Sequence, residues 1–143
     1  MLIIKKKFIS IVLSVCLCIP CFQIVGLFYS PLVAYAATTS DISFSYKKGY
    51  SVDGRIDYRF HRLSKGRPTV KLTALNGASS SNQVKLKLYK GDTYYGVVSF
   101  SSAGTKQYST SVEKGQYYLK VSGGCGDRNG WIQGKGTITP VYS

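Results

Sequence analysis

The chain has 143 residues, with 19 Lys and Arg against 6 Asp and Glu, which gives a formal net charge of +13. This length accommodates one ordinary domain and excludes a two-domain enzyme. Hydrophobic residues make up 44% of the chain and charged residues only 17%, a balance that excludes intrinsic disorder and allows a small packed core.

The first 36 residues have the layout of an export signal. Three lysines at positions 5–7 are followed by an apolar stretch without charge up to Asp41, and Ala34-Tyr35-Ala36 offers a small-x-small cleavage pattern. We predict a secretory signal peptide over residues 1–36, cleaved between Ala36 and Ala37, which leaves no stable transmembrane anchor. The alternative is an uncleaved anchor, since about 20 apolar residues span a bilayer.

Removal of the signal changes which disulfides the protein can form. Three of the four cysteines lie within it, so residues 37–143 hold Cys125 alone, and their 16 Lys and Arg against 6 Asp and Glu give a net charge of +10. One thiol excludes an intramolecular disulfide scaffold. Cys125 is therefore a free thiol that is either buried and inert, or reactive, or open to an intermolecular bond. The long signal and the lack of disulfides indicate a Gram-positive bacterium and a secreted or cell-wall-associated protein.

Beyond the signal, apolar residues alternate with period two, and no stretch shows the period of a helix. The predicted strands are Ile42–Lys47, Arg55–Leu63, Thr69–Leu75, Gln83–Lys90, Thr93–Phe100, Thr105–Val112, Gln116–Val121 and Trp131–Thr139. Turn residues such as Asp53-Gly54 and Asn76-Gly77 separate them. Strands that follow one another without helices predict a single all-β domain over residues 37–143, an antiparallel sandwich or barrel.

The alternation also assigns faces to the strands, because successive side chains point to opposite sides of a sheet. The predicted core consists of Ile56, Tyr58, Phe60, Val70, Leu72, Val84, Leu86, Leu88, Tyr117, Leu119 and Val121. The opposite positions include Arg55, Arg59, Lys71, Lys85, Lys87, Tyr89, Tyr118 and Lys120. If these strands share a sheet, its outer face carries a basic stripe interleaved with tyrosines. The alternative is a merely solvated face that protects strand edges from pairing.

Three segments carry a family resemblance. Gly115-Gln116-Tyr117-Tyr118-Leu119-Lys120-Val121, Gly130-Trp131-Ile132 and the early segment Asp53–Phe60 resemble the bacterial pre-peptidase C-terminal domain family, over about Val52–Pro140. The resemblance implies a jelly-roll-like antiparallel β-sandwich of about eight strands, acting as a non-catalytic binding or maturation module. Relatives are usually appended to secreted enzymes, whereas this chain contains no catalytic domain.

Metal and catalytic sites have little support in the sequence. Some relatives hold calcium, but the acidic candidates are the scattered Asp53, Asp57, Asp92 and Asp127, and calcium needs 6–8 oxygen ligands. One Cys and one His cannot form a closed zinc site. A nucleophilic pair of Cys125 and His61, helped by Arg128, would be similar to sortases, but the residues around the cysteine do not match that family. We predict no enzyme activity, metal or cofactor.

The net charge predicts the kind of partner, because +10 on so small a domain favours binding to anionic surfaces. We predict a secreted, basic, non-catalytic module that binds anionic cell-envelope polymers or glycans, with lysines supplying attraction and tyrosines stacking on sugar rings. Nucleic acid is not an expected partner outside the cell, and no oligomeric state is predicted. The alternative is a secreted cationic effector, a bacteriocin-like toxin or inhibitor that acts on another cell.

Overall fold

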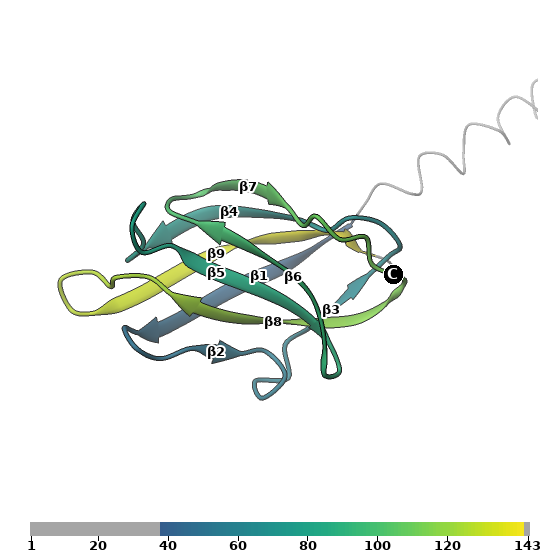
Figure 1. Cartoon of the computed structure of the whole chain (residues 1–143), viewed down its shortest axis with the longest axis horizontal. Helices are drawn as coiled ribbons and strands as arrows, with labels where there is room; N and C mark the ends of the chain where they lie inside the picture. Colours follow the sequence, from purple (N-terminus) through teal and green to yellow (C-terminus); the bar gives the residue numbers. More distant parts are fainter. Residues whose placement is uncertain (1–37, 142–143) are drawn as a thin grey trace, which may run out of the picture. The chain divides into compact units, whose positions relative to one another are not determined.

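The computed structural model describes residues 38–141, which form nine strands. The strands are β1 (Thr38–Lys47), β2 (Val52–Asp53), β3 (Phe60–Leu63), β4 (Thr69–Asn76), β5 (Val84–Lys90), β6 (Thr93–Phe100), β7 (Gly104–Gln107), β8 (Gly115–Gly123) and β9 (Trp131–Val141) (Figure 1). The predicted signal peptide and its cleavage site at Ala36 and Ala37 lie outside the described residues. Within residues 38–141 there is no helix of the length and hydropathy needed to cross a membrane.

The strands form two layers in which every pairing is antiparallel. One layer has the order β1-β9-β4-β7 and the other the order β3-β8-β5-β6, with the short β2 pairing with β8 beyond the end of β3. Among the described strands, ladder pairing passes from one layer to the other only where Leu63 meets Val141. Two four-stranded sheets in this order make a jelly roll. The predicted all-β, jelly-roll-like sandwich is therefore confirmed, with β2 as an addition.

The core lies between the two layers. Alternate residues of β5 and β9 reach it, and Tyr108, in the segment after β7, is fully buried and donates its hydroxyl to the Leu86 carbonyl over 2.9 Å. The predicted core residues of three strands are confirmed as buried: Val70, Leu72, Val84, Leu86, Leu88, Tyr117, Leu119 and Val121. The alternation in these strands reflects one face packed on the core and one facing outward, although the outward-facing Tyr118 of β8 is also buried.

The predicted strand Arg55–Leu63 is wrong in its first half. Asp53 accepts a hydrogen bond from the Arg55 backbone N–H over 2.9 Å, and the Arg59 N–H returns to the Gly54 carbonyl over 2.7 Å. The chain therefore turns, and β3 begins only at Phe60. Short polar side chains that bond the nearby backbone favour such turns over strands.

The turn also reverses the predicted faces. Ile56 and Tyr58, predicted as core, are 74% and 86% exposed, and Phe60 is 44% exposed. His61 and Leu63 of β3 are buried instead. A shift by one residue exchanges the two faces of a strand, and here the turn supplies that shift.

Candidate binding face

One outer face of the β3-β8-β5-β6 layer gathers most of the predicted lysines and tyrosines. In the ladder between β5 and β8, Lys87 lies opposite Lys120, and Tyr89 lies opposite Tyr118. Lys85 lies two residues before Lys87, on the same side of β5. The register thus brings residues from two segments that are far apart in the chain to one surface, which we call the cationic face (Lys85, Lys87, Tyr89, Tyr118 and Lys120).

Aromatic rings extend this face across the sheet. Tyr89 stacks on Tyr118 with ring centroids 5.6 Å apart and planes at 15°, and it contacts Tyr94 of β6 at 5.4 Å. Phe60 of β3 meets Tyr118 edge-on at 6.1 Å. The two ends of this ring cluster are open to solvent, since Tyr94 is 51% exposed and Phe60 is 44% exposed. Sequence reasoning missed Tyr94 and Phe60 as members of the face.

Tyr118 plays a different role from the one predicted. It lies on the outer side of the sheet, yet it is only 2% exposed, and its hydroxyl donates to the Gly91 carbonyl over 2.7 Å. Phe60 and Tyr89 flank its ring, and the ion pair between Arg55 and Asp92, at 2.6 Å, lies next to it. Tyr118 is therefore not available to stack on a ligand. Its ring instead packs against the ring of Tyr89 and holds it in place.

The positive charges of the face differ in how far they are neutralised. The Lys120 Nζ lies 3.1 Å from an Asp53 carboxylate oxygen and 5.1 Å from the Tyr89 ring centroid. The hydrogen bond to Asp53 raises the pKa of Lys120. Lys85 and Lys87, by contrast, form no ion pair within residues 38–141. The free charge of the cationic face is therefore concentrated on β5.

Three predicted residues add no free charge to the cationic face. Lys71 belongs to β4, in the other layer. Arg55 is held by Asp92, whose hydrogen bond raises the pKa of the guanidinium. Arg59 lies at the edge between the layers, where its Nη1 donates to the Ser43 carbonyl over 2.6 Å. Alternation along a strand identifies its solvent side but not the layer to which the strand belongs.

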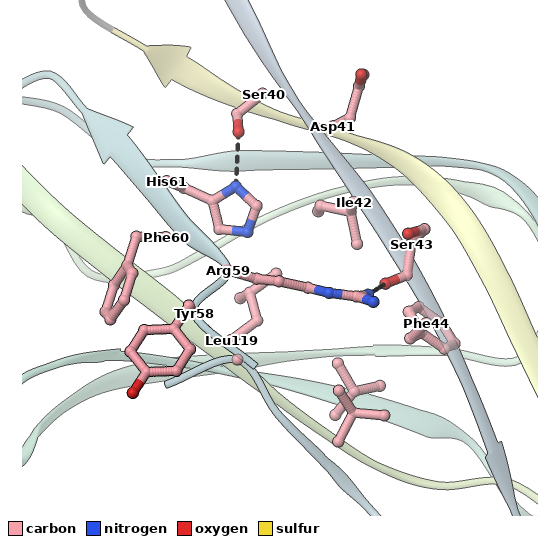
Figure 2. Close-up of a pocket in the computed structure, with 13 residues that line it drawn as sticks. Ser40, Asp41, Ile42, Ser43, Phe44, Tyr58, Arg59, Phe60, His61 and Leu119 are labelled. Atoms are coloured by element: carbon pink, nitrogen blue, oxygen red, sulfur yellow. Dashed lines mark hydrogen bonds between the residues drawn. The ribbon is translucent and has the colours of Figure 1, made fainter. Parts of the chain in front are cut away.

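A pocket of about 260 Å³ opens at that same edge, between β1 and β3 (Figure 2). Leu119 and Val121 of β8 line it together with Ile42 of β1. His61 is buried beside it, and its Nδ1 lies 2.7 Å from the Ser40 Oγ. Burial lowers the pKa of His61 to about 4, so the imidazole is neutral at neutral pH.

The structure separates the residues of the nucleophilic pair considered from the sequence. His61 pairs with Tyr117 near the start of β8. That strand then continues for six residues to Gly123, about 20 Å, before the chain reaches Cys125. The half-buried Cys125 thiol donates to the Gly77 carbonyl at 3.5 Å. No cysteine–histidine chemistry follows from this arrangement.

The aspartates considered for calcium do not form a cluster, and three of them bind other groups of the same chain. Asp53 and Asp92 hold Lys120 and Arg55. Asp127 accepts the backbone N–H groups of Trp131 and Asn129, which lower its pKa. In the described part of the chain, no three His, Cys, Asp or Glu residues gather in a group able to hold a metal ion.

Comparisons with known proteins give one structural likeness to report. The chain is similar to a carbohydrate-binding module of lichenase 5A from Cellvibrio mixtus, solved in complex with cellotriose, with a TM-score of 0.44 and 11% identity over 73% of this chain and 88% of that one. No family model matches the chain, and no curated protein matches it. The resemblance to the pre-peptidase C-terminal domain family thus stays a prediction.

Proposed function

We propose that this protein is an exported, non-catalytic module that binds anionic polysaccharides or other anionic polymers of the cell envelope on its cationic face. The observation that carries the proposal is the position of Lys85 and Lys87. Both ammonium groups lack a carboxylate partner within the described residues, and both lie on the strand that also presents Tyr89. Free charge and a ring surface are thus available to one ligand.

The geometry suits an extended polymer better than a small molecule. Residues two apart on a strand are about 7 Å apart, so Lys85 and Lys87 can contact successive charges along one chain. Tyr94 and Phe60 offer partly exposed rings near the two ends of the aromatic cluster, where a sugar ring can pack. Because Lys85 is exposed and Lys87 is partly exposed, salt screens the attraction.

Reversing the two free charges should release the protein from its polymer. In Lys85→Glu/Lys87→Glu we expect retention on isolated Gram-positive cell walls to fall at least tenfold at low salt, since two attractions become two repulsions. Retention is measured by co-sedimentation across a salt series, on intact walls, on walls stripped of teichoic acid and on a neutral polysaccharide. Loss of retention on stripped walls identifies the anionic polymer as the ligand.

The matched control moves the same charge change to the other layer. Lys71→Glu/Lys135→Glu alters two exposed lysines of β4 and β9 and leaves the cationic face intact. Equal losses in the two double variants would show that bulk charge alone holds the protein, and absence of retention at low salt would contradict the proposal. Growth inhibition or vesicle leakage by the pure protein, without retention, would favour the cationic effector instead.

A further inference from the structure

We propose that the pocket between β1 and β3 is a second binding site, which takes a small amphipathic carboxylate: an apolar body that carries a single carboxylate group. This site adjoins the cationic face, because Phe60 lies at the border between the two, and it offers its ligand a different set of groups. The face offers several exposed charges, whereas the pocket offers one cation over an apolar floor.

The pocket exists because the two layers part at this edge. Among the strands of residues 38–141, ladder pairing joins the layers only through Leu63 and Val141, and β1 and β3 are not paired with each other. The floor of the gap is apolar, made by Ile42, Phe44, Val52, Leu119 and Val121. A volume of about 260 Å³ is small for a ligand pocket, and it fits the body of a small molecule, not a polymer segment.

Arg59 supplies the group that would bind a carboxylate. Its side chain extends across the pocket from the start of β3 toward β1, where one nitrogen donates to the Ser43 carbonyl (Figure 2). No carboxylate of the described residues lies within ion-pair distance of it, and Asp41 points away from the pocket in Figure 2. A guanidinium has five donors in a planar fork, so further donors remain for a carboxylate.

His61 supplies a second polar contact inside the pocket. The residue is only 6% exposed, and Ser40 occupies its Nδ1. The other ring nitrogen has no hydrogen-bond partner among the described residues and is directed toward Arg59 in Figure 2. When the Ser40 hydroxyl donates to Nδ1, Nε2 carries the proton and can donate to the same carboxylate as Arg59.

Two aromatic residues stand at the side of the pocket. Both Tyr58 and Phe60 line it, and they are 86% and 44% exposed. Tyr58 has a φ of 55°, in the left-handed region that bulky residues rarely adopt. The turn therefore holds a tyrosine ring at the pocket despite an unfavourable backbone conformation. An apolar or aromatic ligand body would pack on the floor beside Tyr58, because the Phe60 ring contacts Tyr118 on the cationic face.

The test uses phenylacetate as the probe and its neutral analogue 2-phenylethanol as the comparison. Added to the isotopically labelled full-length protein, phenylacetate should shift the amide NMR signals of Ser40, Arg59 and His61 in a saturable manner. The alcohol should bind at least tenfold more weakly, because it lacks the charge that Arg59 recognises. This comparison needs no variant and remains decisive if a substitution prevents folding.

A pair of variants then assigns the recognition to one residue. Arg59→Gln should weaken phenylacetate binding at least tenfold, whereas Arg62→Gln, at an exposed position of β3 that does not line the pocket, should leave it unchanged. Retention on cell walls should be the same in both variants. The experiments therefore test the pocket and the cationic face separately, and either proposal can be contradicted without the other.

Three results would overturn the inference. The first is the absence of saturable shifts up to about 20 mM probe, where even a millimolar site is filled. The second is a set of shifts confined to Lys85, Lys87 and their neighbours, which would place the carboxylate on the cationic face. The third is equal weakening by Arg59→Gln and Arg62→Gln, which would reduce the effect to general charge.

Discussion

Replacing Gly136 with alanine should prevent the domain from folding. Gly136 of β9 faces β4, where an added Cβ would overlap the Lys71 carbonyl oxygen and would lie 2.7 Å from the Leu72 Cα. Both neighbours are backbone atoms, and β9 is flanked by β1 and β4, so it cannot move away without breaking a ladder. We expect a loss of more than about 4 kcal/mol in the free energy of unfolding, a large part of the stability of an ordinary domain.

The control for this substitution is Gly104→Ala. Gly104 lies in β7, and a Cβ at this position would have no atom within 4 Å. Urea denaturation and the dispersion of amide NMR signals compare the two variants with the parent protein. A Gly136→Ala protein that unfolds cooperatively within 1 kcal/mol of the parent, on the order of an average substitution, would show that β4 can yield at this point.

Lowering the pH from 7 to 4.5 should destabilise the domain by about 2–3 kcal/mol through His61 alone. Burial lowers the pKa of this histidine from 6.5 to about 4 in the folded protein. Between these two values the unfolded chain binds more protons than the folded one. The stabilising contribution is therefore complete above pH 6.5 and is lost as the pH falls toward 4.

Urea denaturation at the two pH values measures this effect, with His61→Gln as the control that removes the titrating group. Asp127 acts in the same direction at lower pH, because its lowered pKa makes its contribution disappear on acidification. The difference between the parent and the variant isolates His61. An identical pH dependence in the two proteins would contradict the assignment.

Much of the fold follows from strands that pack one side on the core. In β5 and β8 the alternation of apolar and polar residues predicts both the strand and its buried side. It fails between Asp53 and Arg59, where Ile56, Tyr58 and Phe60 alternate as in a strand. There the hydrogen bond between Asp53 and the Arg55 N–H forms a turn that a pattern of hydropathy does not record.

The candidate face could be predicted only in part, since it depends on contacts between distant segments. Lys71 and Lys85 have the same alternating surroundings, but β4 and β5 belong to different layers. Tyr118 is buried by groups brought from the turn after β2 and from the turn between β5 and β6. A register shift between Leu88 and Tyr89 places Tyr94 beside Tyr89. None of these contacts is local in sequence.

The place of β9 in its layer bears on how the chain reaches its folded state. β9 is the last described strand, yet it lies between β1 and β4, and Thr38 contacts Val141 across a separation of 103 residues. During synthesis, β1 and β4 therefore cannot complete their pairing until β9 has left the ribosome, after every other strand of residues 38–141. High contact order of this kind slows folding. A chain that folds late stays unfolded for longer, which suits the passage through a translocon that the predicted signal peptide over residues 1–36 would require.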